Sequence, residues 1–521
     1  MHPGGSIFCD LLLDSISKDN QVQVIKAVMK TKLQLLLATL FFCLSCSIYF
    51  QNIHKPQAPF WDENYYIATT ERYLNQIAQL EPHPPLGLMV IAAGEYLFRS
   101  NKHLETRHLA NYTHVAGEQL PQGYSFYGIR FFPALFGALS VVAFLCLMMS
   151  ISGNPWLAGT LALAILFENS FITHFRAAHL DSLQLFLTLC SLLIFTRVYK
   201  REAETTLSAY LLLASVCAAA ILVKVNSAIL LSLFPVLFWK DRKHFGQTRL
   251  LKRIDAYVTK LGACAAGTLL TASAVFTVHV ILGNELPNRA FGAGEKTWQN
   301  ASEVYKDYLE NQTPPTLKLI AYVVRDYYMF MNRDHRGVPK LDPCKPGENG
   351  SHPTSWLFNK KTINYRWDSA HGLTRYVQLT GNQVNWAIGL LGLVMGLCIV
   401  VGVRILKATI TDKLTYTFIE FFLGLYVIFI VIHLYLAEQR VMYLYHYFTG
   451  FVLSLIIAGL AFTYIANTNN LKASTVKVSQ SIFAAISFLN FVWLAPLSLH
   501  WDLTKEQCQA RNFLQQVVDC R

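Results

Sequence analysis

Long apolar runs, separated by shorter polar segments, dominate the pattern of this 521-residue chain. Most of the runs between Leu33 and Leu497 contain about 17 to 25 residues, enough to cross the hydrocarbon core of a bilayer as a helix. We therefore predict an all-α polytopic membrane protein with about eleven spans. The predicted spans are 33–50, 129–150, 156–174, 179–196, 207–223, 226–239, 259–282, 386–405, 415–435, 443–466 and 478–498.

Two long polar segments interrupt the spans and divide the chain into parts. No small-residue cleavage site follows the first apolar run, so we expect no cleaved signal peptide. The second polar segment could form a small cap but leaves little room for a separate large domain. The predicted parts are a cytoplasmic N-terminal segment (1–32), an N-terminal transmembrane module (33–282) with a first external loop (51–128), a large external loop (283–385), a C-terminal transmembrane module (386–498) and an external tail (499–521).

The charge distribution supports this membrane topology. Only 15% of the residues are charged, too few to cover the surface of a soluble protein of this size. The net charge of +12 could indicate nucleic-acid binding, but the basic residues gather in alternate loops. Counted from a cytoplasmic N-terminus, those loops share one face, as the positive-inside rule requires, so we expect no nucleic-acid partner. The residues are Lys26, Lys30, Lys32, Arg197, Lys200, Arg201, Lys240, Arg242, Lys243, Arg249, Lys252, Arg253, Arg404, Lys407, Lys413, Lys472 and Lys477.

The opposite, external face holds both long loops and the C-terminal tail. Eleven cysteines show no paired C-x-x-C spacing, since the single such spacing is Cys43 with Cys46 inside the first apolar run, and this argues against a structural zinc or iron–sulfur site. Three cysteines, Cys344, Cys508 and Cys520, fall on the external face, where disulfides are permitted. We favour Cys508 with Cys520 as the disulfide pair.

Two adjacent carboxylates, Asp62 and Glu63, follow the first span on this face. Carboxylates beside a bilayer are costly unless they face water, pair with a cation or take part in chemistry. They begin a segment with helical spacing of apolar residues, so one of them could cap that helix, and a solvated loop is the plainer alternative. Successive helical residues point about 100° apart, so the other carboxylate could face a cavity and act as a general base.

His83, in His83-Pro84-Pro85, precedes the apolar run Leu86–Phe98. That run is too short to span comfortably and fits an interfacial or re-entrant helix. The proline pair is extended and then favours a helix start. A lone histidine in this setting fits a structural role better than a catalytic one, but His83 shares the external face with Asp62.

A very short external turn carries Arg176, His179 and Asp181. It is either a water-facing hairpin tip or the charged wall of a cavity at the membrane surface. Glu168 and Asn169 favour the wall, because they fall inside the apolar run 156–174, where polar groups generally face the interior of the bundle.

Further cations lie near the external ends of spans, at Arg130, Lys224 and Arg440. Each could snorkel to the interface as a structural residue. Together with the carboxylate pair they resemble a site for a lipid-linked phosphate, because guanidinium and ammonium groups stabilise a phosphate leaving group and a carboxylate activates an acceptor. Protein cations can replace a metal in such a site, so no metal or other cofactor is required, and no residue spacing indicates a divalent ion.

Seven motifs follow one another in a fixed order along residues 55 to 465: Trp61-Asp62-Glu63, His83-Pro84-Pro85-Leu86-Gly87, Arg130, Glu168-Asn169 to Arg176, Leu180-Asp181-Ser182, Gly381-Asn382 and Tyr445-His446-Tyr447. Each motif alone is weakly specific, whereas their combination in this order is fairly specific. On these motifs the sequence resembles the protein O-mannosyltransferases, which are dolichyl- or polyprenyl-phosphate-mannose enzymes of the GT-C membrane fold.

The resemblance implies a GT-C fold with about eleven helices and an active site in an external cavity under the first loop. Asp62 would be the general base on a Ser or Thr hydroxyl, and Glu63 would help to place the acceptor. A single displacement would invert the anomeric carbon of the sugar. The implied donor is a polyprenyl-phosphate-linked sugar held at the bilayer, and the residues implied to bind it or its phosphate are Arg130, Arg176, Lys224, Arg440, His83, Asp181 and His446.

Two departures from the family pattern leave alternatives open. Leu88 stands where family members commonly have lysine, and the large loop is too short for the β-trefoil domain of the eukaryotic enzymes. The short loop points to a bacterial-type member in the plasma membrane, whereas a eukaryotic host would place the enzyme in the endoplasmic reticulum, with the site on the lumenal face. A related transferase of aminoarabinose or arabinose, acting on a lipid or glycan acceptor, is the first alternative. A transporter is the alternative of a different class.

Overall fold

The computed structural model describes residues 18–245, 250–512 and 520, so the predicted cytoplasmic segment before Lys18 and most of the tail after Asn512 lie outside the described residues. Eight helices in the described part are long and apolar enough to cross a membrane, or up to nine with one bent pair. The eight lie in α2 (Lys18–Tyr49), α5 (Tyr127–Ser152), α8 (Asp181–Lys200), α11 (Leu250–Leu282), α16 (Gln383–Arg404), α17 (Lys413–Ala437), α18 (Phe448–Thr468) and α19 (Ala473–Ser498).

The other three predicted spans are also helical, but each is short or broken. The run 156–174 forms α6 (Pro155–Leu166) and α7 (Asn169–Phe175), which meet at a bend of 57°. The run 207–223 forms α9 (Leu207–Ile221), whose 15 residues extend only about 22 Å. The run 226–239 forms the 3-10 helix η3 (Val225–Ser232) followed by α10 (Leu233–Asp241). The predicted all-α membrane fold is therefore confirmed, and the difference in span count comes from these three segments.

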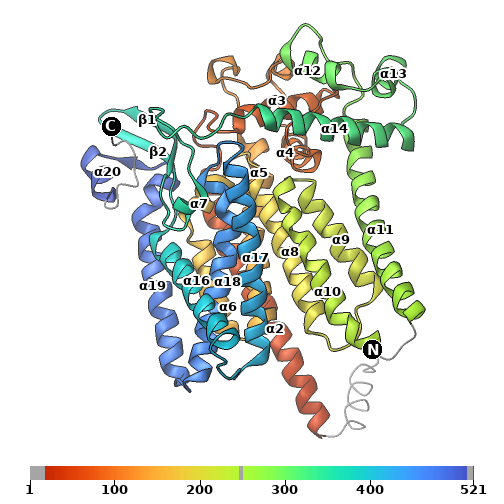
Figure 1. Cartoon of the computed structure of the whole chain (residues 1–521). Helices are drawn as coiled ribbons and strands as arrows, with labels where there is room; N and C mark the ends of the chain where they lie inside the picture. The colour runs from red at the N-terminus through yellow and green to blue at the C-terminus, as the bar shows by residue number, and fades with distance from the viewer. Residues whose placement is uncertain (1–17, 246–249, 513–519, 521) are drawn as a thin grey trace, which may run out of the picture.

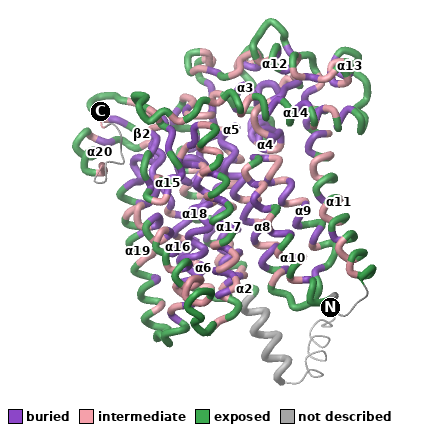
Figure 2. The backbone as a smooth tube through the Cα atoms, viewed as in Figure 1, coloured by how far each residue is buried: buried purple, intermediate pink, exposed green. Residues whose placement is uncertain are grey.

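The core of the bundle lies along α18, whose most apolar window is 78% buried, whereas that of α2 is only 11% buried. Figure 2 shows the same contrast between buried α18 and the exposed faces of α11 and α19. Glycines let α16 approach α18 closely: a Cβ at Gly392 would lie 2.4 Å from the Cβ of Ala458. Small residues at a helix contact are the usual way for membrane helices to pack, because van der Waals contact rather than water exclusion holds them together.

The loops predicted to be external form a layer at one end of the bundle (Figure 1). The first loop contributes α3 (Glu63–Leu74), α4 (Pro85–Phe98), η1 (Arg107–Asn111) and η2 (Gly117–Gln119). The large loop contributes α12 (Gly292–Asn300), α13 (Glu303–Asn311), α14 (Leu317–Gly337), α15 (Pro353–Trp356), β1 (Ile363–Ala370) and β2 (Leu373–Leu379).

The apolar run after the proline pair becomes α4, with Pro85 in its first turn, as the sequence predicts. Strand β2 pairs antiparallel with β1 and with β3 (Asp502–Leu503), so the large loop and the C-terminal tail share one small sheet. The short helix α20 (Lys505–Arg511) follows β3. The favoured Cys508–Cys520 disulfide is present, and Cys344 is free and exposed.

The remaining elements lie at the far end of the bundle. The 3-10 helix η4 (Arg242–Phe245) follows α10 and carries part of the predicted basic loop. In Figure 1 the junctions α10–α11 and α16–α17 lie opposite α3 and α14. Basic loops and candidate active-site residues thus lie at opposite ends of the bundle. The charge pattern of the sequence predicts this arrangement, because it assigns successive loops to alternate faces of the membrane.

Candidate active site

A cavity of about 570 Å³ lies within the layer that carries α3, α4 and α14. Stretches far apart in the sequence line it: the start of α3, residues 80–83, Lys224, the α12 and α14 helices, and residues 440–446. We call it the outer cavity. The sequence-predicted residues that line it are Asp62, His83, Lys224, Arg440 and His446.

Asp62 stands immediately before α3 in the N-cap position, yet its side chain makes no capping hydrogen bond. The carboxylate lines the outer cavity instead. Burial raises the pKa of Asp62 to about 6. The positive charges of Lys224 and Arg440 oppose this rise, and the negative charge of Asp181 adds to it. A carboxyl group with a pKa near 6 is ionised at pH 7 and is a stronger base than an ordinary aspartate.

Trp61 sets the direction in which Asp62 leaves the backbone. Its φ of +53° lies in the left-handed region, which a bulky residue adopts only when its surroundings require it. Aromatic rings surround the indole: Tyr365 at 4.9 Å and Tyr443 at 5.2 Å between ring centroids, with Tyr445 at 6.2 Å. The packing holds the turn in which Asp62 faces the cavity.

Glu63 has a different environment from Asp62, and the structure corrects its expected role. Its carboxylate is fully buried and accepts hydrogen bonds from Arg130 at 2.7 and 2.8 Å and from the backbone N–H groups of Ala178 and Phe60. The outer cavity does not include Glu63 in its lining. A carboxylate enclosed in this way cannot place an acceptor by direct contact.

Arg130 is corrected for the same reason. Besides Glu63, its guanidinium donates to the backbone carbonyls of Ile53, Pro56 and Ala58, and the residue has no exposed surface. All five of its N–H donors are therefore occupied. Arg130 fastens the loop after α2 to α5 and is not available to a donor phosphate.

Arg176 also anchors the chain rather than facing the outer cavity. It donates to the carbonyl oxygens of Tyr49, Gln51 and Ser498, and so joins the end of α2 to the end of α19. The residue is buried and does not line the outer cavity. The expected phosphate contact from Arg176 is therefore not possible in this arrangement.

Lys224 lines the outer cavity and forms a buried ion pair with Asp181 at 2.8 and 2.9 Å. The pair continues into a hydrogen-bonded chain, because Asp181 also contacts His174 Nε2 at 3.0 Å, and His174 Nδ1 contacts the Tyr365 hydroxyl at 2.8 Å. Asp181 thus does not line the cavity itself; it orients the ammonium group that does. The burial of the 176–181 turn excludes the solvated hairpin tip, but Arg176, His179 and Asp181 do not line the outer cavity and so do not form its wall.

Arg440 lines the outer cavity and has few protein contacts. Within the described residues, its side chain donates one long hydrogen bond, from Nε to the carbonyl oxygen of Val441 at 3.5 Å. Most of its N–H donors remain free to meet a ligand.

Two of the sequence-predicted residues that line the outer cavity are histidines. Burial, and after it the charge of Lys224, hold the pKa of His83 well below its usual value, so the ring is neutral at pH 7 and offers a hydrogen bond rather than a charge. His446 Nδ1 accepts from the backbone N–H of Tyr443 at 3.0 Å, within the short 3-10 helix η5 (Leu444–Tyr447).

The buried Glu168 faces the interior of the bundle, as the sequence predicts, but its role is to hold helices together. It caps α7 through Ser170 and accepts from the Asn382 backbone N–H at 2.9 Å and from Trp386 Nε1 at 3.2 Å. These contacts stabilise the bend between α6 and α7. The bend brings His174 and Arg176 into their positions.

Sequence reasoning missed His174 and Tyr365. A histidine inside an apolar run is a signal for a polar network, and it could have identified His174. Tyr365 lies in β1 of the large loop, and no local pattern connects it with a residue 191 positions away. Within the described ranges, no group of three or more His, Cys, Asp or Glu side chains could hold a metal ion.

Comparison with known proteins places this geometry in a family. The family model described as "Dolichyl-phosphate-mannose-protein mannosyltransferase" matches residues 39–282, and "C-terminal four TMM region of protein-O-mannosyltransferase" matches residues 331–517. Together the two models cover most of the chain, including every residue that lines the outer cavity except Ala293, Lys296 and Phe330.

Individual relatives agree with the family models. Protein O-mannosyl-transferase 1 of Danio rerio is 28% identical over 167 residues, which are 32% of this chain and 22% of that protein. Dolichyl-phosphate-mannose--protein mannosyltransferase 2 of Candida albicans is 26% identical over 157 residues, 30% of this chain and 19% of that protein. The matched stretches thus span about a fifth of the length of these curated relatives.

Among solved structures, the S. cerevisiae protein O-mannosyltransferase Pmt1-Pmt2 complex bound to the sugar donor has a similar fold. It superposes with a TM-score of 0.77 over 93% of this chain and 92% of the compared chain, at 13% identity. The resemblance over nearly the whole of both chains shows a shared GT-C fold. With the two family models, it establishes that this chain belongs to the protein O-mannosyltransferase family.

Proposed function

We propose that this protein is a membrane glycosyltransferase that moves mannose from a polyprenyl-phosphate-linked donor to Ser or Thr hydroxyl groups of protein acceptors. One observation carries the proposal: Asp62, free of capping, shares the outer cavity with Lys224 and Arg440 in a member of this family. A base and phosphate-binding cations within one cavity are the parts that glycosyl transfer from a phosphate donor needs.

The donor phosphate would lie against Arg440 and Lys224. Arg440 has free N–H donors for a phosphate oxygen, and guanidinium–phosphate hydrogen bonds are among the stronger ones in proteins. Lys224 gives two of its three N–H groups to Asp181, which leaves one for the phosphate. As the bond from the sugar to the phosphate breaks, negative charge grows on the phosphate, and both cations stabilise it.

Asp62 would act on the acceptor. In our proposal the hydroxyl oxygen attacks the anomeric carbon, Asp62 accepts the hydroxyl proton, and the bond to the phosphate oxygen breaks, releasing polyprenyl phosphate. Attack from the side opposite the leaving phosphate inverts the anomeric carbon. The raised pKa of Asp62, about 6, supports this role because proton transfer is most effective when the pKa of the base lies near the working pH.

The site of the reaction would be the external or lumenal membrane surface. The outer cavity lies at the end of the bundle opposite the basic loops, which the positive-inside rule assigns to the cytoplasm. We expect a lipid-linked donor anchored at that surface to present its phosphate to the outer cavity. Because Arg440 and Lys224 carry the charge of the phosphate, we expect transfer to continue when divalent metals are chelated.

The experiment is transfer by the purified protein in nanodiscs. We expect mannose to pass from polyprenyl-phosphate-mannose to a Ser/Thr peptide, with and without EDTA, and the Asp62→Asn variant serves as the inactive reference. Asp334→Asn removes another carboxylate that lines the same cavity and should retain most of the activity. Transfer of aminoarabinose or arabinose instead, or transfer only to a lipid or glycan, would replace the proposed substrates. Loss of activity in EDTA would overturn the metal-free mechanism.

A further inference from the structure

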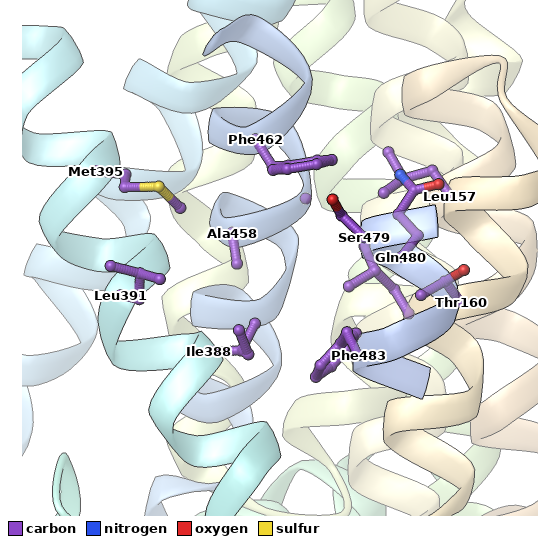
Figure 3. Close-up of a pocket in the computed structure, with 12 residues that line it drawn as sticks. Leu157, Thr160, Ile388, Leu391, Met395, Ala458, Phe462, Ser479, Gln480 and Phe483 are labelled. Carbon is purple, nitrogen blue, oxygen red and sulfur yellow. The ribbon is translucent and has the colours of Figure 1, made fainter. Parts of the chain in front are cut away.

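A smaller pocket, of about 310 Å³, adjoins the outer cavity, because Thr113 and His114 line both. We call it the side pocket. The hollow drawn in Figure 3 is different: it lies among α6, α16, α18 and α19 and is lined mainly by apolar side chains such as Leu391 and Phe483. That hollow shares no lining residue with the outer cavity. Of these two hollows, the side pocket is therefore the one that borders the candidate active site.

Two segments of the loop layer form the walls of the side pocket. One is the stretch 111–119, and the other is the start of α12, at Phe291 and Gly292. The walls are close together, since a Cβ at Gly292 would lie 3.8 Å from Thr113 Oγ1. Phe291, Gly292 and His114 are exposed, so the side pocket opens at the outer surface of the loop layer.

Tyr65 connects the side pocket with Asp62. It lies one helical turn after Asp62, whose carbonyl oxygen accepts from the Tyr65 N–H at 3.1 Å, and it lines the outer cavity. The ring centroids of Tyr65 and His114 are 5.7 Å apart. Side chains one turn apart are about 5–6 Å apart, so the side pocket begins on the order of 10 Å from Asp62. An extended polypeptide covers that distance with about three residues.

The main chain at Thr113 and His114 has unused hydrogen-bonding groups. Among the described residues, neither their N–H groups nor their carbonyl oxygens form a hydrogen bond. Nearby Tyr112 and Ala116 have an extended backbone, with ψ of 150° and 156°. Free N–H and C=O groups on an extended segment can pair with another extended chain, as an added strand does at the edge of a sheet. This wall therefore suits a polypeptide better than a lipid chain.

Lys296 adds an unpaired charge beside the side pocket. It is exposed, lies one turn beyond Gly292 in α12 and lines the outer cavity. In the ranges that the structure describes, its ammonium group forms no ion pair or hydrogen bond. Asp334, an acidic residue of the same lining, lies on the Arg440 side, because the charges of both shift the pKa of His335. Lys296 is thus free to attract a carboxylate of a bound molecule.

The wall formed by α12 is also particular to this chain. The family models match residues 39–282 and 331–517, and α12 lies between these two stretches. Figure 1 places α12 at the outer edge of the loop layer. A wall that neither family model includes can set which acceptors this chain takes without altering the chemistry at Asp62.

We propose that the side pocket and Lys296 form an acceptor subsite, which binds the polypeptide next to the modified Ser or Thr and favours an acidic residue there. The inference rests on the proposed function, because it takes the acceptor hydroxyl to lie at Asp62. The polypeptide passes over Tyr65, pairs with the main chain at Thr113 and leaves the protein beside Gly292. An acidic side chain about three residues from the modified hydroxyl then lies near Lys296.

The charge preference is tested with peptides that differ at one type of position. Each contains one threonine, with Asp, Asn or Lys about three residues away on both sides. We expect the Asp peptide to have the lowest KM. Lys296→Met should raise that KM about two- to fivefold, as expected for a solvent-exposed ion pair, and Lys296→Glu should favour the Lys peptide. Lys318→Met, an exposed lysine of α14 that lines neither cavity, is the matched control.

The side pocket itself is tested by filling it. A Cβ at Gly292 meets only Thr113 Oγ1 within 4 Å, so the fold should accept Gly292→Leu with an unchanged Tm. The leucine should raise the KM of the Asp peptide about tenfold more than that of N-acetylthreonine amide, which is too short to reach the pocket. Gly424→Leu, at an exposed glycine of α17 with open space around it, is the control.

Photocrosslinking locates the acceptor without depending on transfer. A peptide with benzoylphenylalanine about three residues from its threonine should label the stretch 111–119 and α12 in the Asp62→Asn protein, and the Asp peptide should compete. Labelling elsewhere, or mannosylated peptides for which Lys296→Met and Gly292→Leu behave like their controls, would overturn the subsite and leave the proposed function intact. Labelling at these two walls by peptides that the wild type never mannosylates would overturn the proposed function and support the subsite.

Discussion

Asp62 and Glu63 are adjacent in the sequence and chemically alike, yet they belong to two different regions of the molecule. Asp62 lines the outer cavity and makes no capping hydrogen bond. Glu63 lies in a closed cluster, paired with Arg130 and with backbone N–H groups. Polar groups in the outer cavity still have free hydrogen-bonding capacity for a ligand. In the Glu63–Arg130 cluster, the polar groups already bond to one another and to the backbone.

The difference shows that a charged residue near a membrane site has a role in chemistry only if the protein leaves its hydrogen-bonding capacity free. Arg130 uses every N–H donor on the protein, and Arg440 uses almost none. We therefore expect two kinds of mutant. Substitutions in the outer cavity should reduce transfer activity and leave the stability of the fold unchanged. Substitutions in the Glu63–Arg130 cluster should mainly reduce the stability of the fold.

Asp62→Asn should have the largest effect on activity. Loss of a general base typically lowers the rate by about 10²- to 10⁴-fold, and we expect kcat to fall within this range. The Tm should stay the same or rise, because the substitution removes a carboxylate that burial and Asp181 disfavour in its charged form. Transfer kinetics and thermal unfolding on the same preparation measure both. Wild-type kcat in this variant would remove Asp62 from the mechanism.

Glu63→Gln should have the largest effect on stability. Removing one partner of a buried ion pair costs about 3–5 kcal/mol because the other charge remains buried and uncompensated. We expect a large decrease in Tm and in the yield of folded protein. The double variant Glu63→Gln, Arg130→Met should recover part of the loss, since it leaves no unpaired charge. A single variant with an unchanged Tm would contradict the structural role of the cluster.

Arg440→Met should weaken donor binding. A hydrogen bond to a charged group contributes about 1.5–3 kcal/mol, so the KM for the lipid-linked donor should rise roughly 10- to 150-fold. Arg336→Met, at an exposed position at the end of α14, is the matched control and should leave KM unchanged. Equal effects of the two substitutions would indicate a general charge effect instead of a phosphate contact.

The pH profile should report the state of Asp62. Its carboxylate is the active form and its pKa is about 6, so kcat/KM should be level above that pH and should fall about tenfold per unit below it. A bound anionic phosphate disfavours the carboxylate, so the limb in kcat should lie at higher pH than the limb in kcat/KM. A profile that remains level down to pH 4 would show that Asp62 is not titrating in the rate-determining step.

Tyr365→Phe should have the smallest effect. It removes the hydroxyl that contacts His174 and so loosens the chain through Asp181 to Lys224, at a cost of about 0.5–1.5 kcal/mol or a roughly 2- to 10-fold change. Because the chain positions the ammonium group, the change should appear in the donor KM and leave the acidic limb of the pH profile in place. The exposed Tyr328→Phe is the control. An unchanged KM would show that β1 does not influence the site.

Much of the fold was predictable from the sequence. Runs of apolar residues identify membrane helices because lipid cannot satisfy a backbone hydrogen bond, so each run must form a helix on its own. The bend between α6 and α7 and the shortness of α9 were not predictable, because the same runs also fit straight spans. The bend depends on Glu168 meeting Asn382, a contact across 214 positions.

The candidate site was only partly predictable. Asp62 stood out because its motif combines an aromatic residue, a carboxylate pair and a helix start. The four cations near span ends looked equivalent, and local sequence could not separate Arg130 and Arg176, which anchor loops, from Lys224 and Arg440, which face the outer cavity. Their hydrogen-bond partners come from distant loops and helix ends.

By itself, the sequence determined that this chain is a polytopic helical membrane protein, which end of the bundle carries the candidate chemistry, and that Asp62 and Glu63 begin a helix there. These properties depend on local hydrophobicity, on charge and on helix geometry. Each of these can be inferred from a short stretch of the sequence without knowing the tertiary structure. Only the tertiary structure decided which of the two carboxylates is free and which is bound to Arg130. That choice depends on which donors the folded chain brings within hydrogen-bond distance of each carboxylate, and those donors come from Arg130 and Ala178, far along the chain.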